Sequence, residues 1–219
     1  MIRSCLLRAI TFLVVLVPLL ILLASAYQYI QREHVFAFVL TTLAKHDAVA
    51  AAPVPQRASL VGDMSIVGGP SVSASVVNQI LAAAGSPAAG LGQSLYDLSV
   101  QYQVDDAYAL AVFQHESSFG LAGAAVDNHS LGNIVCAGYP TCNGRFRWYA
   151  SWQEGFEDFY RLIVREYVAH GLTTIETIVP VYAPSSENNP TAYIEALRQA
   201  VVRFRSVSLV ANAVLIDNV

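Results

Sequence analysis

The sequence predicts a mainly α-helical domain behind an N-terminal hydrophobic segment and a linker. An uncharged stretch separates Arg8 from Arg32, helical spacing with capping signals recurs from residue 73 onward, and support for a sheet is weak. We therefore expect four parts, which are listed in chain order: residues 1–46 (anchor or signal segment with its extension), 47–72 (linker), 73–205 (helical domain) and 206–219 (tail).

The hydrophobic segment has the length of a membrane helix. Residues 9–30 read AITFLVVLVPLLILLASAYQYI, and a bilayer core needs roughly 20 apolar residues. Arg3 and Arg8 precede it, so the positive-inside tendency places the N-terminus in the cytoplasm and exports the rest. Ala24-Ser25-Ala26 is similar to a signal-peptidase site, which leaves cleavage open, although the long apolar run favours an anchor. We expect a single-pass cell-membrane protein with an extracytoplasmic domain, or a secreted one.

Composition excludes one class of partner. Charged residues make up 13% and hydrophobic residues 55% of the 219 residues. Residues 66–219 hold seven Lys and Arg against thirteen Asp and Glu. Nucleic-acid binding is therefore not expected, because phosphate contacts need clustered basic side chains. Any anionic substrate would have to be held by local contacts.

Helices separated by turns fill residues 73–205. Residues 47–72 are rich in Ala, Val, Pro, Gly and Ser and read as a linker. The first three predicted helices cover 76–85 (after Ser73 or Ser75), 92–103, and 106–116 (with Asp105 as the N-cap). A Ser151–Glu154 capping box begins the fourth, which carries an apolar stripe, and a Thr173–Glu176 pair begins the fifth, which Pro180 stops. The last begins at Asn189-Pro190 and carries a stripe that contains Tyr193. A long loop covers 118–150.

Two cysteines, Cys136 and Cys142, bracket the turn-forming residues AGYPT. In an oxidising compartment a disulfide that closes this short loop is the expected interpretation. A metal site and free thiols are the alternatives. The histidines show no ligand spacing, and His115-Glu116 lacks the second histidine of a zinc-protease helix, so we expect no metal and no cofactor.

Glu116 is the acid whose position is hardest to explain structurally. Helical spacing places it on the apolar face of residues 106–116, and burial there would raise its pKa toward that of a general acid. An acid at a helix C-terminus also opposes the helix dipole. The small residues Ser117, Ser118 and Gly120 are expected to leave space for a bulky substrate. Glu154 and Glu176 are explained by capping, and nothing in the spacing selects Asp127 or Glu187 as a second acid.

Four motifs in order carry a family resemblance: HESSFG at 115–120, LGNI at 131–134, GRFRWYASWQEGFEDFYRLI at 144–163 and VYAPSSENNPTAYIEAL at 181–197. Together they resemble the bacterial glucosaminidase domain of the lysozyme-like superfamily (glycoside hydrolase family 73-like) over roughly residues 73–205, and less closely the lytic transglycosylases. The resemblance implies a lysozyme-like helical fold with a long cleft. It also implies cleavage of peptidoglycan glycan strands next to N-acetylglucosamine.

The resemblance assigns candidate roles to single residues. Glu116 aligns with the family's catalytic acid, and Tyr182 matches a tyrosine that faces it. Asn133 lies in a loop rearranged relative to the family pattern and is a candidate cleft residue. Ser118 is a further candidate for contact with the substrate. Phe146 and Tyr149 are candidates for stacking on sugar rings, with packing in the core as the alternative. The predicted activity is that of an endo-β-N-acetylglucosaminidase. The rivals are a lytic transglycosylase, which would leave anhydro ends, and a non-catalytic, membrane-tethered wall-binding module.

Overall fold

The computed structural model describes residues 64–185 and 189–216, with side chains as far as residue 209. The predicted anchor, the linker up to residue 63 and Glu187 lie outside these residues. Within them the domain is mainly helical, as predicted, and the only sheet is a two-stranded hairpin. The elements, in chain order, are α2 (Ala74–Ala83), α3 (Gly92–Tyr102), α4 (Asp106–Ser117), α5 (Ala125–Asn128), β1 (Cys142–Asn143), β2 (Phe146–Arg147), α6 (Trp152–Glu166), the 3-10 turn η1 (Val168–His170), α7 (Ile175–Tyr182) and α8 (Pro190–Ile216).

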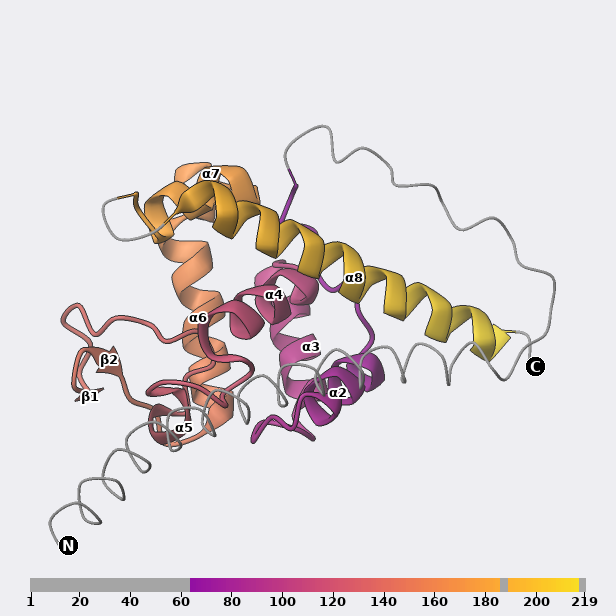
Figure 1. The fold of residues 1–219 in the computed structure, drawn as a ribbon, viewed down its shortest axis with the longest axis horizontal. Coiled ribbons are helices and arrows are strands. Elements are labelled where there is room, and N and C mark those ends of the chain that lie inside the picture. The colour runs from indigo at the N-terminus through magenta and orange to yellow at the C-terminus, as the bar shows by residue number, and fades with distance from the viewer. Residues whose placement is uncertain (1–63, 186–188, 217–219) are drawn as a thin grey trace, which may run out of the picture. The chain divides into compact units, whose positions relative to one another are not determined.

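Helix α4 is the centre of the domain and lies between α3 and α8 (Figure 1). Its residues from 106 to 113 are all buried, because the segment is apolar on every side after its first turn. The Phe113 ring packs on Phe156 and Phe159 of α6, with ring centroids 5.7 and 4.8 Å apart. Such aromatic packing fixes α4 against α6 in a rigid core.

Most predicted helix starts are confirmed. The Asp105 side chain accepts from Ala107 N at 2.9 Å, as an N-cap does. Ser151 Oγ accepts from Glu154 N at 3.3 Å, and Glu154 in turn accepts from Ala150 N. Asn189 Oδ1 accepts from Ala192 N at 3.1 Å at the start of α8. Local side-chain chemistry thus sets where these three helices begin.

The predicted start of α7 is wrong by one residue. Thr174, not Thr173, is the N-cap, and its partner in the capping box is Thr177. Glu176 instead pairs with Arg198 of α8 and accepts from Met64 N at 2.7 Å. Pro180 lies inside α7, which ends at Tyr182 rather than at the proline.

Helix α8 is longer than the sequence indicates. It continues to Ile216, through the tail to which the sequence assigned no structure. The tail is apolar at most positions, so its sequence shows no alternation of apolar and polar faces that would indicate a helix. No helix within the described ranges combines the length and the apolar character needed to cross a membrane.

Residues 64–72, assigned to the linker by sequence, pack on the domain as a strap. Ile66 N donates to Thr173 O and Ile66 O accepts from Asp105 N, at 3.0 and 2.8 Å, while the Ile66 side chain is 0% exposed. Further along, Ser71 N and Val72 N donate to the Asp106 carboxylate. Backbone pairing and one buried side chain therefore join the strap to the starts of α4 and α7, which no local sequence period would reveal.

We predict that Ile66→Ala lowers the free energy of unfolding of the domain by about 2–5 kcal/mol, because it leaves a cavity beneath the strap. Chemical denaturation of the purified chain measures this. The matched control is Val67→Ala, whose side chain is 39% exposed and should change stability by less than about 0.5 kcal/mol. Equal, small effects of both substitutions would mean that the strap is not docked.

Candidate active site

A cavity of about 600 Å³ lies at the C-terminal turn of α4. This volume is typical of small-molecule sites. Helices α4, α6, α7 and α8, the loop before β1 and strand β2 all contribute to its wall. We call it the Glu116 pocket, and its lining residues are His115, Glu116, Asn133, Ile134, Val135, Ala137, Arg145, Phe146, Arg147, Leu162, Tyr167, Tyr182, Ala183 and Tyr193.

Glu116 faces this pocket from the last turn of α4 and is half-buried. Burial raises the pKa of its carboxyl above the ordinary value, because the charged form loses hydration. The Tyr193 hydroxyl donates a hydrogen bond to Glu116 Oε1, which acts in the opposite direction on that pKa. Burial has the larger effect on this pKa, as expected for a carboxyl on the apolar face of the helix.

Tyr193 is the functional candidate that sequence reasoning missed, since it was assigned only to the packing stripe of α8. Its side chain is 5% exposed, and its ring stacks on His115 with centroids 3.9 Å apart. A buried tyrosine usually finds a partner for its hydroxyl, and this partner is Glu116, 77 residues earlier in the chain. A hydroxyl-bearing side chain on an otherwise apolar stripe was the available signal.

Tyr182 lines the same pocket from the end of α7, but it does not bond Glu116. Its hydroxyl donates to Gly132 O at 3.2 Å, and its ring meets the Tyr193 ring edge-on at 6.5 Å. Burial, and then the charge of Glu116, raise the pKa of Tyr182 well above its ordinary value, so it stays protonated. The structure thus places Tyr182 near the acid, while its catalytic role remains a prediction.

Asn133 adopts a left-handed backbone conformation, with φ of 45°, in the loop after α5. Its Nδ2 donates to the backbone carbonyl of Glu116 at 2.8 Å. This bond satisfies one of the carbonyls that a helix C-terminus leaves without an internal partner. Asn133 also lines the Glu116 pocket. It thus combines a position at the cavity wall with a bond that holds the end of α4.

The small residues after Glu116, which were expected to leave space for a substrate, form a tight turn, and none of them lines the Glu116 pocket. Ser118, Phe119 and Gly120 all have positive φ. The Ser117 hydroxyl donates to Leu131 O at 2.7 Å and accepts from Gly120 N. A Cβ at Gly120 would lie 2.7 Å from the Leu131 side chain. Ser118 does not line the Glu116 pocket.

The two aromatic candidates near the hairpin have different positions. Phe146 lines the pocket beside Arg145, whose guanidinium carbon lies 5.4 Å from the ring centroid. Tyr149 is 2% exposed and donates to Asp158 Oδ2 at 2.7 Å, so it has no face for a sugar. For Tyr149 the alternative interpretation, packing in the core, matches the structure.

Cys136 and Cys142 form the predicted disulfide. The loop that it closes supplies Ala137 to the pocket. Among the described residues, no group of three or more His, Cys, Asp or Glu side chains could hold a metal ion.

Within the same residues, Glu116 is the only carboxylate that lines the pocket. Glu154 caps α6 by its contact with Ala150 N, and Asp127 is exposed on α5. The described part of the pocket wall therefore contains one acid, three tyrosines (Tyr167, Tyr182 and Tyr193) and one phenylalanine.

No family model and no curated protein matches this chain. Among solved structures, the fold is similar to that of S. aureus autolysin E. One of these structures is a complex with the muropeptide NAM-L-Ala-D-iGlu, with a TM-score of 0.47 and 13% identity over 66% of this chain and 73% of that chain. Another is a catalytic mutant in complex with the disaccharide NAG-NAM, with a TM-score of 0.48 and 12% identity over 68% and 74%. At such identities the likeness concerns the fold alone.

We predict that Tyr193→Phe raises the pKa of Glu116 further, because the carboxylate loses the hydrogen bond that favours its charged form. Titration of the Glu116 carboxyl carbon by NMR measures the shift. Tyr182→Phe is the matched control, since that hydroxyl bonds Gly132 O instead. An equal shift in both variants would contradict a specific role of Tyr193.

Proposed function

We propose that this chain is a peptidoglycan hydrolase that cleaves the glycan strand next to N-acetylglucosamine, with Glu116 as the general acid. The observation that carries the proposal is a half-buried carboxyl of raised pKa at the wall of a cavity of about 600 Å³. The four motifs around it, which resemble those of bacterial glucosaminidases, supply the substrate class. The aromatic rings of Phe146, Tyr167 and Tyr182 offer apolar faces of the kind that sugar rings pack against.

The hydrogen bond from Tyr193 assigns the two oxygens of Glu116 different tasks. Oε1 accepts from Tyr193, whereas Oε2 has no hydrogen-bond partner among the described residues. In the protonated acid, Oε2 then carries the proton and is the oxygen available to a substrate. Donation from Oε2 to the glycosidic oxygen would assist departure of the leaving sugar as an oxocarbenium-like centre develops.

The second part of the proposal concerns the group that stabilises or attacks the oxocarbenium-like centre. Paired-carboxylate glycosidases place their acids about 5–5.5 Å apart for retention and about 6.5–9.5 Å apart for inversion. The described residues bring one carboxylate to the pocket. This arrangement suits assistance by the acetamido oxygen of the substrate itself, followed by attack of water. Activation of water by a more distant acid is the alternative, and attack by the muramic 6-hydroxyl would make the enzyme a lytic transglycosylase.

We also propose that the domain works outside the cytoplasm, held at the cell membrane by the segment of residues 9–30 or released if that segment is cleaved. The length and the flanking arginines of the segment support this. Fractionation of cells that express the chain, with protease added from outside, tests the location.

We predict that Glu116→Gln lowers the rate of peptidoglycan cleavage by on the order of 100-fold or more, because the amide cannot donate the proton. Release of soluble fragments from purified peptidoglycan measures the rate. Glu154→Gln is the matched control, since that acid contacts a backbone amide outside the pocket. A folded Glu116→Gln variant with unchanged cleavage would exclude Glu116 as the acid. Wall binding without any cleavage by the wild type would instead favour the binding module.

Mass spectrometry of the products separates the two enzymatic readings. Reducing ends at N-acetylglucosamine are expected, whereas anhydro ends on muramic acid would identify a lytic transglycosylase.

The activity should depend on pH through Glu116. The acid must be protonated to work, so the rate is expected to fall as pH rises through its pKa. Because burial raises that pKa above 4.5, the decline should begin at a higher pH than for an ordinary glutamate. Rates of cleavage measured from about pH 4 to about pH 9 test this. A rate that stays constant over this range would contradict the assignment.

A further inference from the structure

A second cavity, of about 290 Å³, adjoins the Glu116 pocket. The two cavities share Ala137, Arg147 and Leu162 in their linings. We call the second one the arginine pocket, because its lining contains three arginines; the full set is Ala137, Gly138, Tyr139, Pro140, Arg147, Asp158, Arg161, Leu162 and Arg165.

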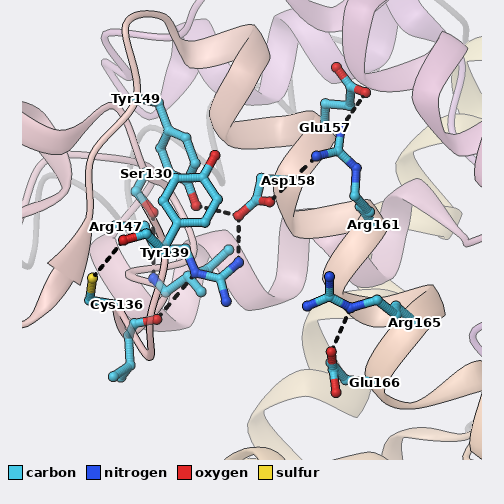
Figure 2. Close-up of polar contacts among 12 residues, drawn as sticks. Ser130, Cys136, Tyr139, Arg147, Tyr149, Glu157, Asp158, Arg161, Arg165 and Glu166 are labelled. Atoms are coloured by element: carbon cyan, nitrogen blue, oxygen red, sulfur yellow. Dashed lines mark hydrogen bonds and ion pairs between the residues drawn. The ribbon is translucent and has the colours of Figure 1, made fainter. Parts of the chain in front are cut away.

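The charges of the arginine pocket differ from those of the whole chain, which has a net charge of −4. Three arginines against one aspartate leave its lining with two positive charges in excess. The aspartate, Asp158, is already engaged: its Oδ2 accepts from Arg147 Nη1 and from the Tyr149 hydroxyl, both at 2.7 Å. Figure 2 shows Asp158 between Arg147 and Arg161.

The two outer arginines, Arg161 and Arg165, are half-exposed or more, and each makes a close ion pair with a half-exposed glutamate. Arg161 pairs with Glu157 and, at the longer distance of 3.9 Å, with Asp158 Oδ1, whereas Arg165, one turn further along α6, pairs with Glu166 (Figure 2). Their side chains are 48% and 64% exposed, and ion pairs at such exposure contribute only about 0–1 kcal/mol. Neither glutamate lines the pocket. A ligand carboxylate can therefore replace Glu157 and Glu166 as the partner of these guanidinium groups with little loss of free energy.

The inner wall of the arginine pocket is rigid and also offers donors. Arg147 bonds Val135 O through Nε and Asp158 through Nη1, which leaves Nη2 without a hydrogen bond among the described residues. The Tyr139 ring lies 4.8 Å from the Arg147 guanidinium carbon, and the Tyr139 hydroxyl likewise has no partner in the described part of the chain. Guanidinium and phenol donors at a concave surface suit a carboxylate, which arginine recognises in a planar, bidentate way.

We propose that the arginine pocket binds a carboxylate of the substituent that muramic acid carries, while the glycan strand lies in the Glu116 pocket. This inference deepens the proposed function and rests on it for the identity of the strand. A substituent branches away from the glycan, and the shared wall at Arg147 places the arginine pocket beside the strand. The carboxylate comes either from the lactyl group of muramic acid or from the peptide attached to it.

Binding of small probes to the full chain, purified in detergent, tests the proposal by calorimetry without any need for cleavage. The first probe is N-acetylmuramoyl-L-alanyl-D-glutamate, and its matched control is the same compound with both carboxyl groups amidated. Arg165→Gln and Arg161→Gln are each expected to weaken binding of the acid probe by about three- to tenfold and to leave the amide unaffected. N-acetylmuramic acid alone distinguishes the sources: arginine-dependent binding of this probe assigns the lactyl carboxylate, and its absence beside binding of the dipeptide probe assigns the peptide.

Glu166→Gln provides the sharpest control, because Glu166 competes for Arg165. A ligand-binding role predicts opposite effects, with weaker binding in Arg165→Gln and equal or tighter binding in Glu166→Gln. A merely structural ion pair predicts that both substitutions weaken binding alike, and this result would overturn the proposal. Equal affinity of the acid and amide probes would overturn it as well.

The same variants separate this inference from the proposed function when they are assayed on purified peptidoglycan. Cleavage by the wild type with arginine-independent probe binding would reject the arginine pocket and leave the hydrolase intact. Arginine-dependent binding without cleavage would reject the hydrolase and leave the carboxylate site.

Discussion

The burial of α4 is the constraint on which the arrangement of the site depends. A helix whose first two turns are packed on every side cannot rotate or slide without loss of core contacts. The packing of these turns therefore fixes the direction in which the side chains of the last turn point. Asp105 caps its start, and the strap bonds Asp106. At the other end, the Asn133 amide donates to Glu116 O, and backbone amides of the turn after Ser117 donate to the carbonyls of Phe113, Gln114 and Ser117. Glu116 therefore faces the pocket because the whole helix is held in place.

Two carboxyls of α4 show why burial alone does not make a catalytic acid. Burial raises the pKa of Asp106 to about 7, and burial also raises that of Glu116. However, Asp106 is enclosed by the strap, and its Oδ1 accepts from Ser71 N and Val72 N. Glu116 lies at a cavity wall and keeps Oε2 without a partner among the described residues. Both acids have a shifted pKa, but only Glu116 can also reach a substrate.

Local patterns predicted what local chemistry controls. The N-caps at Asp105 and Ser151, the helical character of the domain and the Cys136–Cys142 disulfide all follow from residues close in sequence. Contacts between distant segments were beyond such patterns. Tyr193 meets Glu116 across 77 residues, and Ile66 pairs with Thr173 and Asp105. An apolar period identifies which face of a helix is buried, but it cannot tell which group a hydroxyl on that face will meet.

Arg147 connects the two cavities through one buried ion pair. It lines both, and its partner Asp158 is fixed in turn by the Tyr149 hydroxyl. A buried pair with a third hydrogen-bonding group resists displacement, since separating it would leave a charge without compensation. The distance between the two cavities is then set by this pair, by β2 and by the disulfide-closed loop. A substrate that places its glycan in one cavity and its carboxylate in the other must match this fixed distance. Binding of the carboxylate-bearing substituent would then also position the glycosidic bond beside Glu116.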